Sequence, residues 1–141
     1  MKTKITLFLL GLTFIFACAP SGPEPIAFNK DACDYCKMQI SEPPFAAQLI
    51  TQKGRVYKFD DVKCMIAYSK SEQQAVKTYY LADFEGEHQL FDATNAWLVK
   101  SDDIKSPMGG NTVAFSTKEQ AEQHAKTLQN ASILTWSNLT R

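Results

Sequence analysis

The sequence predicts an α+β fold: a single domain built from two similar ββαβ-type units with mainly antiparallel sheets. Its 141 residues are enough for one domain, and apolar residues make up 45% of them, as expected for a globular protein with a hydrophobic core. A weak internal repeat is the second observation. Residues 56–61 and 113–117 each run from an apolar strand into a helix cap, and each is followed by a helix and a further strand.

The first 17 residues have the pattern of an export signal. Lys2 and Lys4 precede the apolar stretch 5–16, which is too short to cross a bilayer. This stretch leads to Cys18 through a small residue and resembles a lipobox, which implies cleavage before Cys18 and attachment of lipid to its sulfur. An ordinary signal peptide with cleavage nearby is the alternative.

A segment rich in proline and glycine follows the signal. We expect residues 18–27 to form a solvated tether and residues 28–141 to form the folded domain. Lipid chains on Cys18 would hold this domain at a membrane surface, facing the periplasm, without a transmembrane helix. The residue after Cys18 is Ala19 rather than Asp, and this favours the outer membrane in a cell with two membranes.

Alternation of polar and apolar residues predicts the strands of the first unit, and a cap predicts its helix. Asp60 and Asp61 offer the N-cap of this helix. The strands are expected over 37–40, 45–51, 55–59 and 78–82, and the helix is expected over 62–70.

The second unit begins after an exposed turn at 85–88. The residues 116–119 form a capping box, which predicts a helix that ends near Gln129. Strands are expected over 96–100, 112–115 and 133–136.

Lipid attachment at Cys18 would leave three cysteines, Cys33, Cys36 and Cys64. An odd number in an exported protein means that at least one of them cannot form an intramolecular disulfide. We therefore expect a free or metal-bound thiol. Cys64 lies in the first predicted helix and is interpreted as a buried structural cysteine rather than a ligand.

The segment from Cys33 to Met38 places two thiols three residues apart and a thioether two residues further on. Soft sulfur ligands of this kind suit Cu(I). Met108 is the preferred thioether, because it lies in a loop beside Gly109 and Gly110 where no apolar periodicity calls for a large side chain. Met38 is the second choice, since a methionine in a strand is usually a core residue.

Three other uses of the cysteine pair stay open. A thioredoxin-like redox pair needs a helix to begin at its first cysteine, whereas a strand pattern follows Cys36. A structural zinc site needs four ligands, and His88 and His124 are isolated residues, interpreted as a turn residue and a semi-buried helix residue. A disulfide between Cys33 and Cys36 is the simplest alternative in an oxidising compartment.

The order of three short motifs resembles the NosL family over residues 32–136. This resemblance implies a fold of two ββαβ units and a lipid-anchored, Cu(I)-binding accessory protein for assembly of the copper centres of nitrous-oxide reductase. It also implies that Cys36 and Met108 are the principal metal ligands, with Met38 completing the first motif and Cys33 as an auxiliary ligand. The motifs are Cys-x-x-Cys-x-Met at 33–38, Phe-Asp-Asp before Cys-Met at 59–65, and Met-Gly-Gly at 108–110.

We therefore expect a membrane-tethered Cu(I) metallochaperone, not an enzyme, that delivers copper to an exported copper enzyme or its assembly complex. A thiol–disulfide oxidoreductase using Cys33 and Cys36 is one competing hypothesis. A lipoprotein module that binds proteins without metal is the other. The formal net charge is zero and the basic residues are not clustered, so the sequence gives no electrostatic support to a nucleic-acid partner.

Overall fold

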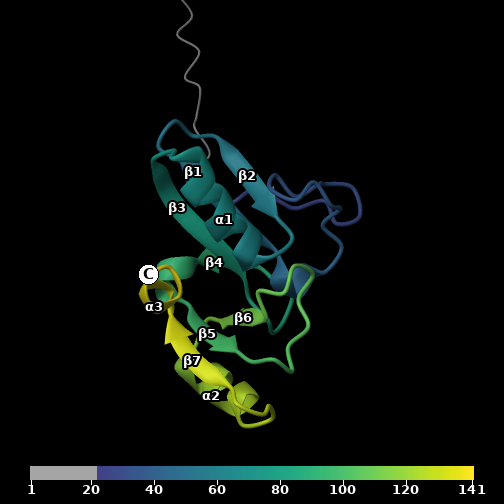
Figure 1. Ribbon diagram of the computed structural model, residues 1–141, viewed down its shortest axis with the longest axis vertical. Helices are drawn as coiled ribbons and strands as arrows, with labels where there is room; N and C mark the ends of the chain where they lie inside the picture. Colours follow the sequence, from purple (N-terminus) through teal and green to yellow (C-terminus); the bar gives the residue numbers. More distant parts are fainter. Residues whose placement is uncertain (1–21) are drawn as a thin grey trace, which may run out of the picture.

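The structure of the protein is a computed structural model that describes residues 22–141 (Figure 1). The predicted export signal and the lipid-attachment residue Cys18 lie outside the described residues. Within residues 22–141, no helix has the length and apolar character needed to cross a membrane. Two sheets, each accompanied by one main helix, follow one another along the long axis of the molecule.

The first sheet has four antiparallel strands in the order β2-β1-β3-β4. β1 and β2 form a hairpin, the chain then enters α1 (Val62–Glu72), and β3 returns on the other side of β1. Figure 1 shows α1 lying across this sheet, where it contacts β1 and β2. The strands are β1 (Ala47–Thr51), β2 (Val56–Phe59), β3 (Val76–Ala82) and β4 (Leu90–Asp92), and the 3-10 helix η1 (Pro43–Phe45) precedes them.

The second sheet repeats this arrangement with three antiparallel strands in the order β6-β5-β7. The helix α2 (Lys118–Ala125) contacts all three strands. The strands are β5 (Trp97–Lys100), β6 (Thr112–Phe115) and β7 (Ser132–Thr135), with the 3-10 helix η2 (Ala93–Asn95) before them and α3 (Trp136–Leu139) after them. The α+β prediction of two ββαβ units is therefore confirmed.

The two halves share one hydrophobic core. Leu98 of β5, Ala114 of β6 and Trp136 of α3 are buried in the same cluster as the residues of the first sheet. In the other direction, Phe84 packs against the smaller cluster of the second sheet, and its N–H donates to the Ala114 carbonyl at 2.7 Å. Burial of apolar surface across the junction holds the halves in one arrangement.

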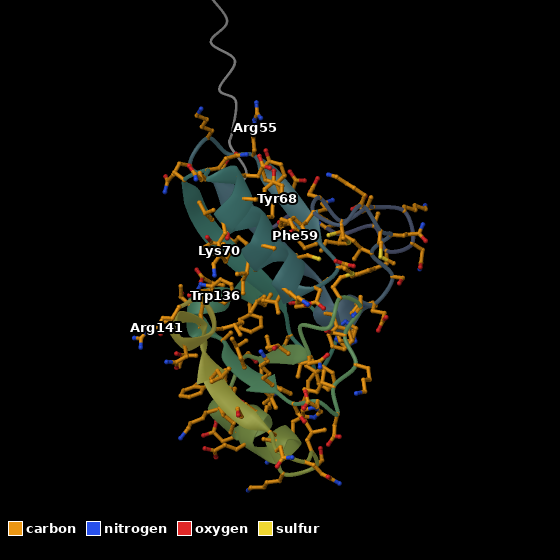
Figure 2. All side chains as sticks on the ribbon, in the orientation of Figure 1. Arg55, Phe59, Tyr68, Lys70, Trp136 and Arg141 are labelled. Carbon is orange, nitrogen blue, oxygen red and sulfur yellow. The ribbon has the colours of Figure 1, made fainter. Side chains whose placement is uncertain are left out.

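Aromatic rings pack α1 onto its sheet. The Tyr68 ring of α1 lies 5.4 Å from the Phe59 ring of β2 between centroids, and 4.8 Å from the Tyr57 ring (Figure 2). Phe59 is fully buried. These contacts fix the end of β2, and with it the residues that follow directly in the chain.

The caps of α1 and α2 agree with the caps predicted from the sequence to within one residue. Asp61 caps α1, since its side chain accepts a hydrogen bond from the Lys63 N–H at 2.8 Å. Thr117 caps α2 instead of Ser116, and it accepts from the Gln120 N–H at 3.3 Å. α2 also ends earlier than Gln129, at Ala125.

The strand predicted over 37–40 is wrong. Lys37 has φ +65°, a left-handed conformation that interrupts extended backbone, and only an isolated bridge between Ala32 and Gln39 closes the segment as a turn. Met38 and Ile40 consequently do not share a side. Ile40 is buried, whereas Met38 is 56% exposed and does not belong to the core.

The structure also differs from the sequence at shorter elements. β4 and α3 are absent from the sequence prediction, because the three residues of β4 (Leu-Phe-Asp) show no polar–apolar alternation and α3 is a single turn of four residues, in which a helical period cannot repeat. At the N-terminal side, the Glu24 N–H donates to the side chain of buried Gln48 at 2.8 Å and the Glu24 carbonyl accepts from it at 3.0 Å. The part of the predicted tether around Glu24 is thus attached to the domain.

Candidate metal centre

Cys33 and Cys36 lie in a tight loop that is held against β2. Within the loop, the Cys33 N–H donates to the Met38 carbonyl at 2.7 Å and the Cys33 carbonyl accepts from the Lys37 N–H at 3.0 Å. Two further bonds attach the loop to Lys58 of β2. The Asp34 N–H donates to the Lys58 carbonyl at 2.9 Å, and the Asp34 carboxylate accepts from the Lys58 N–H at 2.7 Å.

The chain then brings two more potential ligands to these thiols. Asp60 is the first residue after β2, and Cys64 lies in the first turn of α1. The Cys36 Sγ donates to the Asp60 Oδ2 at 3.4 Å. One ligand atom from each of Cys33, Cys36, Asp60 and Cys64 lies within 4.8 Å of all the others. The result is a cluster of three sulfurs and one carboxylate, which we call the thiol cluster.

Burial distinguishes Cys36 from the other members of the thiol cluster. Cys33 is 0% exposed, and Cys64 and Asp60 are each 2% exposed, whereas Cys36 is half-buried. A metal ion or an acceptor protein arriving from solvent would therefore meet Cys36 first. The three cysteines of the described residues are all free thiols.

Burial also determines the ionisation of the two inner thiols. Desolvation raises the pKa of Cys33 to about 11, although neighbouring backbone groups of Asp60, Cys36 and Tyr35 act in the opposite direction. Desolvation likewise raises the pKa of Cys64, and the nearby Cys33 and Asp60 add to this increase. Both thiols are therefore protonated at neutral pH, and a metal ion that binds them as thiolates must displace their protons.

Asp60 has an unsatisfied oxygen inside the protein. Among the described residues, its Oδ1 is the buried side-chain oxygen or nitrogen atom that has no hydrogen-bond partner. A buried polar atom without a partner costs about 1–3 kcal/mol. A cation bound in the thiol cluster would lie beside the Asp60 carboxylate and offset the cost of burying it.

Asp61, the next residue, holds the loop that carries Met108. Its Oδ2 accepts from the Ser106 hydroxyl at 2.7 Å, from the Met108 N–H at 3.0 Å and from the Gly110 N–H at 3.2 Å. The Lys63 ammonium of α1 donates to the Met108 carbonyl at 3.1 Å. The Met108 loop is thus fixed at the N-terminus of α1, although 47 positions separate Asp61 from Met108 in the chain.

The four sequence-predicted ligands have different surroundings. Cys33 and Cys36 belong to the thiol cluster. Met108 is partly buried and packs against the same core cluster as Cys36. Met38 follows Cys36 by two residues and is exposed to solvent.

Sequence reasoning missed Asp60 as a potential ligand and assigned Cys64 to the core. Cys64 is indeed buried, but its sulfur also faces the cysteine pair. One signal was present in the sequence. Two consecutive aspartates precede the predicted helix and only one of them was needed as the cap, so the carboxylate of Asp60 was available for another role.

The remaining titratable candidates have structural surroundings. The His124 ring packs 4.7 Å from the Phe84 ring and 5.2 Å from the Phe115 ring, and burial lowers its pKa. His88 has φ +54° in a turn, where its Nδ1 lies 3.0 Å from the Asp83 carbonyl oxygen. Both agree with the sequence interpretation of these histidines.

A redox role receives no support from the geometry of the pair. A reactive cysteine needs an accessible thiol with a lowered pKa, commonly at the start of a helix. Cys33 is fully buried with a raised pKa, and the segment after Cys36 is a turn rather than a helix.

Comparison with known proteins identifies one family. The NosL family profile matches residues 25–141. Among solved structures, the chain is similar to the crystal structure of the copper chaperone NosL from Shewanella denitrificans, with a TM-score of 0.74 and 20% sequence identity. The alignment covers 86% of this chain and 98% of that chain, and it shows a common fold. A search of the curated proteins finds no match to the sequence.

The contact between Gly110 and Asp61 can be tested by substitution. A Cβ at Gly110 would collide with the Asp61 carboxylate, which its hydrogen bonds hold in place. We expect Gly110→Ala to lower the free energy of unfolding by about 1–3 kcal/mol in urea denaturation. Gly22→Ala is the control, because that position faces open space, and it should change stability by less than about 0.5 kcal/mol. Equal stability of the two variants would contradict the close packing described above.

Proposed function

Because the chain belongs to the NosL family, we propose that it is a membrane-tethered metallochaperone that binds Cu(I) and delivers it to nitrous-oxide reductase. The family is one of copper chaperones and not of enzymes. The observation that carries the proposal is the thiol cluster, in which three free thiols and a carboxylate lie within 4.8 Å of one another.

The types of ligand favour Cu(I) as the cargo. Thiolate and thioether sulfur are soft ligands, and they select Cu(I) over the harder divalent cations that prefer oxygen. Around Cys36, the protein offers the thiols of Cys33 and Cys64, and the Met108 thioether packs against the same core cluster. Cys36 and Met108 are proposed as the principal ligands, with Cys33 and Met38 assisting.

The exposure of these residues suits a protein that releases its cargo. Cys36 and Met108 are partly buried, so an acceptor can reach a metal bound between them, and Met38 and Tyr35 are exposed on the same loop as Cys36. Copper can then pass to the acceptor by stepwise exchange of ligands. A fully enclosed set of ligands would have to open first.

The assignment of Cys36 and Met108 predicts the effect of removing them. We expect the double variant Cys36→Ala/Met108→Ala to lose Cu(I) affinity by about 100-fold or more. Loss of a group that only orients a metal ligand already lowers metal affinity by about 10–100-fold, and loss of the ligand itself should lower it at least as much. The measurement is an anaerobic titration of the reduced full chain with Cu(I) in competition with a chromophoric chelator.

Met65→Leu is the control for this titration, since it replaces a buried sulfur of α1 with a side chain of similar volume. It should keep the affinity of the unsubstituted protein. Unchanged affinity in the double variant would show that the two ligands are wrongly assigned. No binding by the unsubstituted protein would refute the copper function.

We propose further that lipid on Cys18 tethers the protein to the membrane, with the domain facing the periplasm. Support comes from the sequence alone, namely the short apolar segment that leads to Cys18. A lipid anchor also leaves a domain free to meet exported partners at the membrane surface.

The tether predicts the fractionation of a Cys18→Ala variant. We expect this variant to incorporate no labelled fatty acid and to be lost from the washed membrane fraction, because the lipid supplies the membrane affinity. Cys64→Ala serves as the matched cysteine control and should remain in that fraction. Labelled fatty acid on the Cys18→Ala variant would contradict the assignment.

The proposed client predicts direct transfer of copper. When the Cu(I)-loaded protein is mixed anaerobically with copper-free nitrous-oxide reductase, we expect copper to appear in the enzyme after the two are separated. Transfer should be faster than from a Cu(I)–chelator complex that maintains the same concentration of free Cu(I). The reason is that ligand exchange at Cys36 does not require copper to dissociate into solution first. Transfer no faster than from the chelator complex would remove nitrous-oxide reductase as the client.

A further inference from the structure

Two members of the thiol cluster, Cys64 and Asp60, are not among the Cu(I) ligands assigned above. Cys64 and Asp60 come from the first turn of α1 and the residue after β2, and both are buried. Neither is needed as the helix cap, because Asp61 performs that function. Their ligand atoms nevertheless lie within 4.8 Å of those of Cys33 and Cys36.

The spacing of the sulfurs suits a single metal ion between them. A metal–thiolate bond is about 2.3 Å long, so three thiolates around one ion in a plane are about 4 Å apart. The distances in the thiol cluster are at most 4.8 Å. Shifts of less than about 1 Å therefore bring the three sulfurs to bonding positions, and rotation of the half-buried Cys36 side chain can supply much of this shift.

The unsatisfied oxygen of Asp60 is a second observation that fits a cation at this position. Its Oδ1 is buried without a hydrogen-bond partner, while its Oδ2 accepts from the Cys36 thiol at 3.4 Å. Asp60 therefore directs negative charge at the sulfurs. The N-terminus of α1, where Cys64 lies in the first turn, carries partial positive charge that offsets the accumulation of anionic ligands.

We propose that Cys33, Cys36 and Cys64 form a buried three-thiolate position for Cu(I), bordered by Asp60. The inference rests on the proposed copper function and adds a second position to it. Cys36 belongs to both positions, because it also contributes to the partly exposed site with Met108. Cu(I) would be retained in the inner position, and it would move outward when Met108 or an acceptor ligand replaces Cys64.

The test counts the sulfur ligands of Cu(I) after removal of the thioethers. The full-chain variant Met38→Ala/Met108→Ala is loaded anaerobically with one equivalent of Cu(I), and its X-ray absorption fine structure is measured. We expect three sulfurs at about 2.3 Å. With Cys64→Ala added, we expect two sulfurs and a fall in Cu(I) affinity of about tenfold or more.

Two further variants keep this test decisive. Cys64→Ser keeps the shape of the side chain with an oxygen in place of the sulfur, and Cys64→Ala keeps its apolar character, so whichever variant folds should show the loss of one sulfur. Met65→Leu is the control, because Met65 points about 100° away from Cys64 around the axis of α1. Its loss should leave the three sulfur ligands of Cu(I) unchanged. Circular dichroism of each variant establishes that it is folded before the ligands are counted.

The failure of this inference can be distinguished from failure of the copper function. An unchanged sulfur number and affinity after loss of Cys64 would overturn the inner position while the Cu(I) function stands. If the unsubstituted protein binds no Cu(I), both the inner position and the copper function are refuted. Tight binding of Zn(II) by the thioether-free variant, without binding of Cu(I), would also overturn the inference, because it would make the thiol cluster a four-ligand zinc site.

Discussion

The carboxylate of Asp61 joins the two halves of the protein at the candidate metal centre. It accepts one hydrogen bond from the first turn of α1 and three from the loop that carries Met108. Because Asp61 is 1% exposed, water competes little for these bonds. The shared hydrophobic core brings the two sheets together, and Asp61 determines where the Met108 loop lies relative to the helix.

The end of β2 organises the rest of the site. In two consecutive positions the chain supplies Asp60 to the thiol cluster and Asp61 to the helix cap. The loop of Cys33 and Cys36 is attached to the same strand through Lys58. A short stretch of backbone therefore connects the sulfur ligands, the helix start and the second half of the fold, and small shifts of β2 would affect all three.

The site combines reactive groups with an environment that keeps them unreactive. Burial holds the inner thiols in their protonated form, which protects them from oxidation and from exchange with other thiols. Only the half-buried Cys36 faces the route to solvent. Such an arrangement suits storage and handover of a soft metal ion better than attack on a disulfide, which needs an exposed thiolate.

The sequence by itself determined the features that depend on neighbouring residues. Alternation and capping residues were sufficient for the two ββαβ units, and the spacing of Cys33 and Cys36 was sufficient to place two thiols together. The predicted strand over 37–40 failed because the left-handed Lys37 turns the segment, and the alternative interpretation of Met38 as a core residue failed with it. Only the tertiary structure decided that Cys64 and Asp60 face the cysteine pair and that Asp61 holds the Met108 loop. The physical reason is that periodicity and caps report contacts within a few residues, whereas these contacts form when sheets and helices pack.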